Sequence, residues 1–539
     1  MDIVKNLKIK IQEALAKLGQ EISLDDIIIE KSKDEAHGDY ASNVAMKFSR
    51  VLAKKPKNIA SLIVENIDTT GIDKIEIAGP GFINFFMKHD SLQVFVSKII
   101  KENDNYGRLK KKNLKVNVEF VSANPTGLLH VGTARGAAIG DSICRLLDFA
   151  GYDVTREYYI NDAGSQIDNF ALSLQARYRQ AFGLEGVIPE NGYEGYDIVE
   201  IAQIIKNEIG DKALKMDNPI EYFKEKGIKI ELERIIEDLE TFRVHFDVFS
   251  SEKEIRSNRA IEKEIEYLKD YIYEQDQALF LRTTDFLDDK DRVIKKSNGE
   301  YTYFMPDICY HVDKMSRGFD YLIDVLGADH HGYVNRMKSA LMMHGYKEDT
   351  LHVELIQMVR FIKDGQEFKA SKRKGDAITL RDVCEEVGVD AMRYFFAMRA
   401  ATTHLDFDMD LAIEQSLNNP VYYAQYAHAR LCSILEQGQD IKIDESAKYL
   451  KEKAEISLLK HLADFSNVVS DSATEKAPYK ITNYIHSLAG LIHVFYNECR
   501  VIDRDNLLLS GSRLALVKAS KIVLKNALTL IGVSAPTQM

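Results

Sequence analysis

The segment VSANPTGLLHVGTARGAA, residues 121–138, places a histidine where a strand passes into a helix. The preceding residues KVNVEF alternate apolar side chains as a strand does, and apolar residues follow at helical spacing from Ile139. His130 therefore lies at the start of a helix, beside Gly127 and Gly132, where bare backbone lets a phosphate approach the helix N-terminus. Taken alone, a histidine at such a position is more often an ordinary loop residue.

Two other polar segments suit a nucleotide. GADHHG, from Gly327 to Gly332, ends a strand-like run. Ligands of open α/β sheets bind beyond the carboxyl ends of strands, and an acid there commonly holds a ribose hydroxyl. KASKRKG begins at Lys369 and includes Lys372, and both lysines are suitable point charges for a triphosphate. A structural turn and a solvated basic loop are the respective alternatives.

Acidic residues in two further segments suit a cationic ligand. In YTYFMPD, Tyr303 and Asp307 are four residues apart and share one face if the segment is helical. A surface turn is the alternative there. Glu119 lies within an apolar strand, where a buried acid is costly unless it is paired. That cost favours a functional role for Glu119.

The composition describes a soluble globular protein of several domains. The chain has 539 residues, 45% of them hydrophobic and 29% charged. We find no apolar stretch of membrane-spanning length and no signal-peptide core. The five cysteines are scattered, which favours a reducing cytoplasm and argues against a structural zinc site. The net charge of −12 argues mildly against a surface coated for nucleic acid but allows local basic patches.

The order of the elements predicts an α/β multidomain fold. Strand-like and helical segments alternate in the middle of the chain, as in a Rossmann-like domain with a parallel sheet. A small α+β domain precedes it and an all-α bundle follows. KIEIAGPGFINFFM in the first domain reads as a strand pair turned at its glycines. The expected boundaries are a first domain at 1–88, a linker at 89–114, the sheet domain at 115–375 with a mostly helical insertion at about 165–285, a connecting region at 376–415 and the bundle at 416–539.

Taken in this order, the segments resemble the class I aminoacyl-tRNA synthetases and, within them, the arginyl-tRNA synthetase family. HVGT stands where that class carries its HIGH signature, and KASKR where it carries KMSKS. SANPTGLLHVG, YTYFMPDICYHVDK, LGADHHGYV and NPVYYAQYAHAR also resemble arginyl-enzyme segments. The chain departs from the signatures at Thr133, in place of the second histidine, and at Ala370, in place of methionine. Threonine keeps a hydroxyl donor but cannot carry charge.

The resemblance implies a two-step reaction. ATP, with Mg²⁺, and arginine would give arginyl-adenylate and pyrophosphate, and the terminal ribose of the tRNA would then take the arginyl group. Such chemistry needs positioning and charge stabilisation. The implied catalytic residues are His130, Thr133, Lys369 and Lys372. The implied ATP-binding residues are Gly127, His130, Gly132, Gly327, Asp329, Lys369, Ser371, Lys372 and Arg373.

The same resemblance assigns an arginine site. Asp307 and Glu119 would face the guanidinium fork, because a planar set of donors suits carboxylates held in its plane. Tyr303 would pack along the side-chain stem. Asn124 would bind the amino or carboxylate end of the substrate, with Ser122 assisting. The full implied set is Glu119, Ser122, Asn124, Tyr303, Asp307 and His330.

The resemblance also assigns the tRNA contacts and the setting. The bundle would receive the anticodon, with Tyr422, Tyr426 and Arg430 as candidates for base contacts, although such tyrosines could equally belong to the core. Tyr40 and Asn84 are the candidates in the first domain. The implied partners are the arginine tRNA, L-arginine and ATP, for a cytoplasmic monomer without membrane contact. The alternatives are a small-molecule nucleotidylyltransferase and a non-catalytic RNA-binding paralogue.

Overall fold

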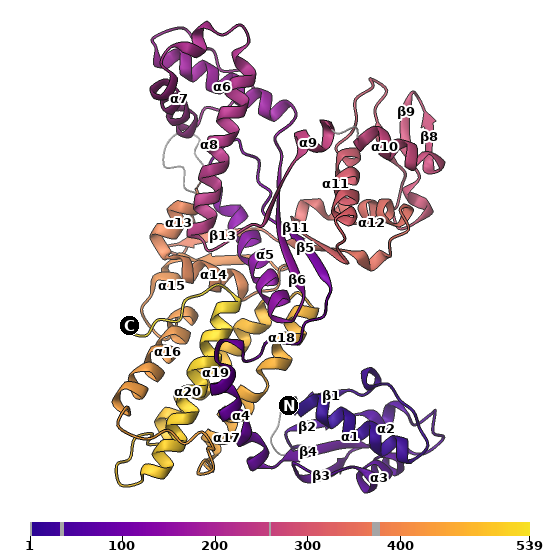
Figure 1. Ribbon diagram of the computed structural model, residues 1–539, viewed down its shortest axis with the longest axis vertical. Helices are drawn as coiled ribbons and strands as arrows, with labels where there is room; N and C mark the ends of the chain where they lie inside the picture. Colours follow the sequence, from indigo (N-terminus) through magenta and orange to yellow (C-terminus); the bar gives the residue numbers. More distant parts are fainter. Residues whose placement is uncertain (1–2, 33–36, 258–259, 369–377) are drawn as a thin grey trace.

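The computed structural model describes residues 3–32, 37–257, 260–368 and 378–539. A central parallel sheet carries a helical excursion at one end and the C-terminal helical bundle at the other, and the N-terminal domain lies beside the bundle (Figure 1). This arrangement has the α/β multidomain form that the sequence predicts. Within the described part of the chain, no helix is long and apolar enough to cross a membrane.

The N-terminal domain is a four-stranded antiparallel sheet with helices packed on it. The strand order is β1-β2-β4-β3. The expected strand pair is confirmed as β3 and β4, joined through Gly79 and Gly81, both with positive φ. The elements are α1 Ile3–Lys17, β1 Ile29–Lys31, β2 Tyr40–Ser42, α2 Val44–Lys47, α3 Pro56–Asn66, β3 Ile72–Ala78 and β4 Phe82–Met87.

The segment expected to be a linker is largely a helix. α4 spans His89–Glu102 and packs against α17 (Lys453–Ala463) and α20 (Leu507–Leu530) of the C-terminal bundle (Figure 1). The charged residues 101–113 that suggested a linker begin at the last turn of this helix and mostly follow it, while Leu92, Val96 and Ile99 are buried at helical spacing within it. The hydroxyl of Tyr106 donates to the carbonyl of Leu462 over 3.0 Å, which extends this contact beyond the helix.

The central sheet has five parallel strands in the order β12-β11-β5-β6-β7. Its strands read as short apolar runs because helices cover both faces. α5, Val131–Phe149, is the crossover between β5 and β6. The strands are β5 Lys115–Glu119, β6 Asp153–Ile160, β7 Val248–Ser251, β11 Tyr321–Gly327 and β12 Leu351–Ile356.

The expected single insertion at about 165–285 is wrong, because the chain returns to the sheet within it. A helical excursion with its own apolar core leaves after β6 and ends before β7, the fifth strand of the central sheet. A second excursion of helices and a three-stranded antiparallel sheet follows β7. The sequence does not predict β7, because its four residues VFSS are too few to show the alternation of a strand. The first excursion is α6 Ser165–Ala181, α7 Tyr196–Ile209 and α8 Pro219–Thr241, and the second is α9 Glu252–Ser257, α10 Ala260–Tyr267, β8 Ile272–Gln275, β9 Ala278–Leu281 and β10 Arg292–Lys295.

Two helices close the sheet domain, and a small sheet connects it to the bundle. The helices are α11 Phe304–Ser316 and α12 Val334–Met343, and the connecting elements are β13 Val359–Lys363, β14 Gln366–Glu367, α13 Leu380–Val387, α14 Val389–Ala397, β15 Leu405–Asp408 and α15 Met409–Ile413. The remaining bundle helices are α16 Pro420–Gln437, α18 Phe465–Thr474 and α19 Tyr479–Glu498. One continuous apolar core joins the N-terminal domain, the central sheet and the bundle.

α5 lies unusually close to the strand before it. A Cβ built on Gly140 would stand 2.5 Å from the ring of Phe120, a distance that forces something to shift. Gly136, one turn earlier on the same helix, has nothing within 4 Å of such a Cβ. The close approach at Gly140 therefore sets how deeply α5, with His130 at its start, sits on the sheet.

We predict opposite stability effects for two Gly→Ala changes in α5. Gly140→Ala should lower the free energy of unfolding by about 1–3 kcal/mol, because it overpacks the contact with Phe120. Gly136→Ala is the matched control and should raise it by up to about 1 kcal/mol, because alanine favours the helix. Denaturant unfolding measures both. Equal effects of the two changes would show that the contact at Gly140 does not limit the packing.

Candidate active site

His130 caps α5. Its backbone is extended, and its ring Nδ1 accepts a hydrogen bond of 2.8 Å from the backbone N–H of Gly132. An accepting Nδ1 carries no proton, so the neutral ring has its N–H at Nε2. Burial lowers the pKa of His130, which keeps the ring neutral at pH 7. A Cβ at Gly132 would stand 2.8 Å from Nδ1, so glycine is needed there to seat the ring.

Thr133 does not offer the free donor that the sequence suggests. Its Oγ1 donates to the backbone carbonyl of His130 over 2.7 Å, within the first turn of α5. The hydroxyl proton is thus engaged in the cap, and only the oxygen lone pairs face outward. Thr133 therefore stabilises the turn that carries His130 rather than presenting a second donor beside it.

A cavity of about 940 Å³ opens beside His130. Gly127 and His130 line it from the crossover, and Phe368 and Ile378 line it from the two sides of the 369–377 segment. The predicted loop residues Lys369, Ser371, Lys372 and Arg373 lie outside the described residues. The crossover and the flanks of the basic segment thus face one cavity.

GADHHG forms a short 3-10 turn at the carboxyl end of β11. Gly327 ends the strand, and a Cβ there would stand 2.6 Å from Oδ1 of Asp329. The side chain of Asp329 is 85% exposed, and the Nε2 of His330 lies 3.8 Å from its Oδ2. The turn therefore presents an acid to solvent at the strand end where a ribose is expected.

Three carboxylates form a row across the middle of the central sheet. Glu119 on β5 is in register with Asp324 on β11 on one side and with Glu157 on β6 on the other. Residues in register on parallel strands point to the same face. All three are buried, at 8%, 2% and 0% exposure respectively. Like charges this close and this deep are tolerated only with cations over them.

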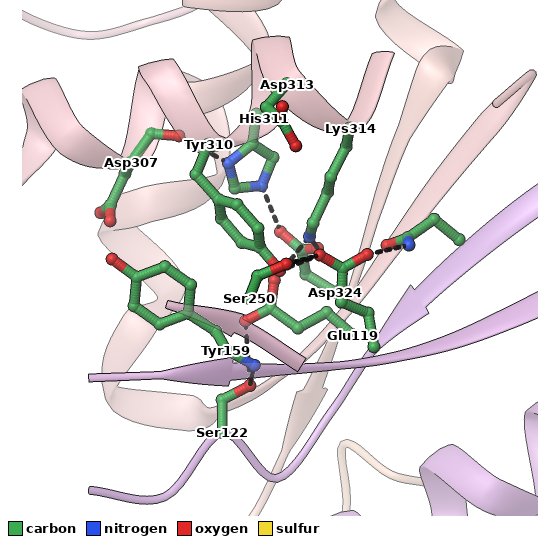
Figure 2. Close-up of polar contacts among 12 residues, drawn as sticks. Glu119, Ser122, Tyr159, Ser250, Asp307, Tyr310, His311, Asp313, Lys314 and Asp324 are labelled. Atoms are coloured by element: carbon green, nitrogen blue, oxygen red, sulfur yellow. Dashed lines mark hydrogen bonds and ion pairs between the residues drawn. The ribbon is translucent and has the colours of Figure 1, made fainter. Parts of the chain in front are cut away.

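α11 supplies those cations. Lys314 Nζ donates to Oε2 of Glu119 over 2.5 Å and to Oδ1 of Asp324 over 3.2 Å (Figure 2). Arg317, directly after the helix, contacts both oxygens of Glu157 at 2.8 and 2.9 Å. These side chains share the face of α11 that lies on the sheet, so the helix closes over the acids by ion pairing.

His311 is the third cation. Its Nε2 lies 2.8 Å from Oδ2 of Asp324, and its Nδ1 lies 2.8 Å from the backbone carbonyl of Asp307. A carboxylate and a carbonyl both accept, so both ring nitrogens must donate and the ring is an imidazolium. Burial opposes this charge, but the Asp324 carboxylate outweighs it and raises the pKa of His311.

Asp307 is a nearby acid that does not take part in this ion-pair network. Among the described residues its carboxylate makes no hydrogen bond or ion pair, and Figure 2 shows it pointing away from the ion-paired cluster. Burial raises the pKa of Asp307 to about 7, against the opposing effect of His311. Tyr159 and Tyr333 are close enough for Asp307 to raise their pKa values, so the half-buried acid lies among aromatic side chains. Such surroundings suit a single organic cation.

The other predicted arginine ligands lie around the same edge of the sheet. Ser122 Oγ donates to Oε1 of Glu119 over 3.0 Å and accepts from the backbone N–H of Tyr159. Asn124 Nδ2 donates to Oε1 of Gln166 over 2.7 Å. Tyr303 directly precedes α11 and is 74% exposed. The structure thus brings Glu119 and Ser122 into contact, while Asn124 and Tyr303 make no contact with them.

The sequence analysis missed the residues that neutralise the acids. Asp307, His311 and Lys314 follow one another at i, i+4 and i+7, which is a polar stripe on one face of a helix. Asp324 lies in the apolar run YLIDVLG, as Glu119 lies in KVNVEF. Asp324 is therefore also an acid within an apolar strand, which is costly unless it is paired. The remaining missed members are Glu157 and Arg317.

The bundle residues predicted to contact tRNA lie together on α16. The rings of Tyr422 and Tyr426 stack with centroids 6.0 Å apart and planes 8° apart. Arg430 Nη2 donates to the Tyr426 hydroxyl over 2.8 Å, and its guanidinium lies over the ring of Tyr496. These residues line an open groove of about 590 Å³. All three predicted side chains are only half-buried, so they are not core residues.

The two candidates in the N-terminal domain are placed differently. Tyr40 on β2 is 5% exposed and Asn84 on β4 is 3% exposed. Tyr40 points into the apolar core of that domain. Since neither side chain reaches the surface, we correct this prediction: any tRNA contact of the domain must use other residues.

Three family models match consecutive parts of the chain. They are the arginyl tRNA synthetase N terminal domain over residues 5–87, the catalytic domain of class I tRNA synthetases (R) over 95–418, and the DALR anticodon binding domain over 424–539. The parallel sheet, the His130 crossover and the catalytic-domain match define a class I aminoacyl-tRNA synthetase.

Relatives give the narrower assignment. The chain is 50% identical to the arginine–tRNA ligase of Bacillus subtilis over 99% of this chain and 98% of that protein. It is also 50% identical to arginine–tRNA ligase 2 of Bacillus thuringiensis over the full length of both. The fold matches the Thermus thermophilus arginyl-tRNA synthetase with a TM-score of 0.78, covering 99% of this chain and 100% of that one at 21% identity. The chain belongs to the arginyl-tRNA synthetase family.

We predict that Asp307→Asn stabilises the protein more at pH 8 than at pH 5. Folding raises the pKa of this carboxyl from 3.8 to about 7, so the folded state binds the proton more tightly. Stability therefore falls as pH rises from about 4 to 7, and the full cost, on the order of 2–4 kcal/mol, is present above pH 7. Asparagine removes that cost. Thermal unfolding of both proteins at the two pH values measures the difference, and an equal shift at both would contradict it.

Proposed function

We propose that the chain joins arginine to its tRNA in two steps. ATP and arginine form arginyl-adenylate and pyrophosphate, and the arginyl group then passes to the terminal ribose of the tRNA. The observation that carries the arginine assignment is Asp307, an acid with no ion-pair partner among the described residues, which lies between aromatic side chains and a balanced set of buried charges. A guanidinium is the cation that would complete that balance.

The first step takes place at the cavity beside His130. The neutral ring donates from Nε2 to phosphate oxygens as charge builds on them, and the N-terminus of α5 favours the same charge. ATP enters as its magnesium complex, in which the phosphates provide much of the coordination. Asp329 holds the ribose, and Lys369 and Lys372 take the pyrophosphate.

Arginine is selected by the geometry of its acceptors. The planar guanidinium donates to Asp307 and Glu119 together, with Tyr303 along the aliphatic stem and Asn124 at the amino or carboxylate end. Lysine carries the same charge but has no planar fork. Bound lysine would therefore leave buried acceptors unpaired. Unpaired buried acceptors discriminate against a substrate more strongly than a difference in side-chain size does.

The tRNA is held far from the chemistry. The groove on α16 offers the stacked rings of Tyr422 and Tyr426 to unpaired bases, with Arg430 as a cation for the backbone or a third stacking plane. The chain acts as a cytoplasmic monomer in this scheme. Light scattering on the purified protein, with and without tRNA, tests the monomeric state.

The first functional prediction concerns arginine use. The wild-type protein should charge the arginine tRNA with labelled arginine, and Asp307→Asn should raise the KM for arginine by roughly 10²-fold, equivalent to about 2–3 kcal/mol. The KM for ATP should change little. The wild-type KM for arginine should rise about tenfold per pH unit below 7, because the acid of raised pKa must lose its proton to bind a cation.

The variant is its own control for the pH effect. Asparagine does not titrate, so the low-pH rise in KM should disappear in Asp307→Asn. An unchanged KM in the variant, or the same pH profile in both proteins, would remove Asp307 from the site. Absence of charging by the wild-type protein would overturn the function itself.

The second functional prediction separates the two roles of His130. His130→Ala should lower arginylation by roughly 10²-fold or more, because it removes a donor that acts as charge develops. It should also cost about 1 kcal/mol of stability through loss of the cap. His130→Asn keeps a capping acceptor, so it should recover the stability but not the activity. Activity within about threefold of wild type in folded His130→Ala would exclude the catalytic role.

A further inference from the structure

Lys314 is a fully buried lysine directly beneath the proposed arginine site. Its Nζ bridges Glu119 and Asp324, which are opposite one another on adjacent strands, and lies 4.3 Å from the ring centroid of Tyr310. Glu157 from β6 also contributes to the field at this ammonium. The network holds the pKa of Lys314 above its usual value, despite burial, so the side chain remains charged.

The charges of this region balance around Lys314. The acid row of Asp324, Glu119 and Glu157 contributes three negative charges, and His311, Lys314 and Arg317 contribute three positive ones. The negative charge of Asp307 is then left for a ligand to match. Glu252 of α9 is the acid outside the row that also raises the pKa of Asp307. Loss of Lys314 would leave a second negative charge in the same place.

Lys314 also fixes the orientation of Glu119. It holds Oε2, while Ser122 holds Oε1, so both oxygens of the carboxylate are tied to one plane. Each oxygen still has a lone pair for another donor. A guanidinium fork requires the carboxylate to lie in its own plane, so this orientation decides whether Glu119 can accept from it.

We propose that Lys314 is a positioning residue for arginine selection: it orients Glu119 toward the substrate guanidinium and cancels Asp324, so that the site presents the charge for one cation. This inference rests on the proposed function. Because loss of one partner of a buried ion pair also destabilises the fold, the test must separate the KM for arginine from stability.

Arg317 provides a matched control. It is also a cation of the α11 face, and it pairs with the third acid of the row, Glu157, but it does not touch Glu119. Glu157 keeps hydrogen bonds from Ser250 and Tyr310 if Arg317 is lost. Both substitutions to methionine therefore unbalance the same row by one charge, and only Lys314→Met releases Glu119.

The test is arginylation by wild type, Lys314→Met and Arg317→Met, after each has shown a cooperative thermal unfolding transition. Lys314→Met should raise the KM for arginine at least tenfold, leave the KM for ATP within about threefold, and narrow the kcat/KM preference for arginine over lysine. Arg317→Met should leave the KM for arginine within about threefold. Lys314→Gln, which keeps N–H donors for the two acids, should recover part of the arginine KM.

Several results would overturn the inference. The inference fails if the KM of Lys314→Met for arginine is within threefold of wild type. It also fails if the KM for arginine rises equally in Lys314→Met and Arg317→Met. If neither Lys314 variant folds while Arg317→Met does, Lys314 serves the fold and the inference fails. Wild-type charging in the same assay separates these outcomes from failure of the proposed function, which would show as no arginylation by any of the proteins.

Discussion

The catalytic domain depends on how three in-register carboxylates are neutralised. Asp324, Glu119 and Glu157 point to one face of the sheet at one level, and all three are buried. Ionised acids cannot be packed there unless a complementary set of cations is brought over them. α11 and the residue after it supply those cations, so the position and rotation of the helix on the sheet depend on electrostatics as much as on its apolar contacts.

His130, the proposed phosphate donor, is held by rigid elements rather than by a loop. His130 is fixed as the cap of α5, and α5 is fixed on the sheet by the close contact at Gly140. The middle of the helix is tied to the rest of the molecule through Asp141, the residue after Gly140. This acid pairs with Arg393, whose guanidinium also donates to the carbonyls of Phe242 and Ile531 at 2.9 and 3.0 Å. One buried arginine thus joins the crossover helix, the end of the helical excursion and the C-terminal helix.

Stability and the proposed function conflict at Asp307. The carboxylate is kept half-buried without a partner, which raises its pKa and makes its ionised form costly. The same feature favours binding of a cation at the proposed site, because a positively charged ligand would offset the free-energy cost of the buried, ionised carboxylate. Natural proteins commonly keep such strained positions where a ligand binds. Asp324 and Glu157 show the contrast: they are more deeply buried but paired within the chain, and so they belong to the scaffold.

The sequence by itself determined the domain order and the crossover at His130, and it left the segment that carries Asp307 open between a helix and a turn. The first two follow from periodicity and from motifs that are local in the chain. It also singled out Glu119, since an acid in an apolar strand is visible without a structure. It could not show that Lys314, 195 residues away, holds that acid, that β7 completes the sheet, or that Tyr40 and Asn84 are buried. Strand register decides which acids are neighbours, and register depends on contacts between segments far apart in the chain. Only the tertiary structure therefore decided which carboxylate stayed unpaired.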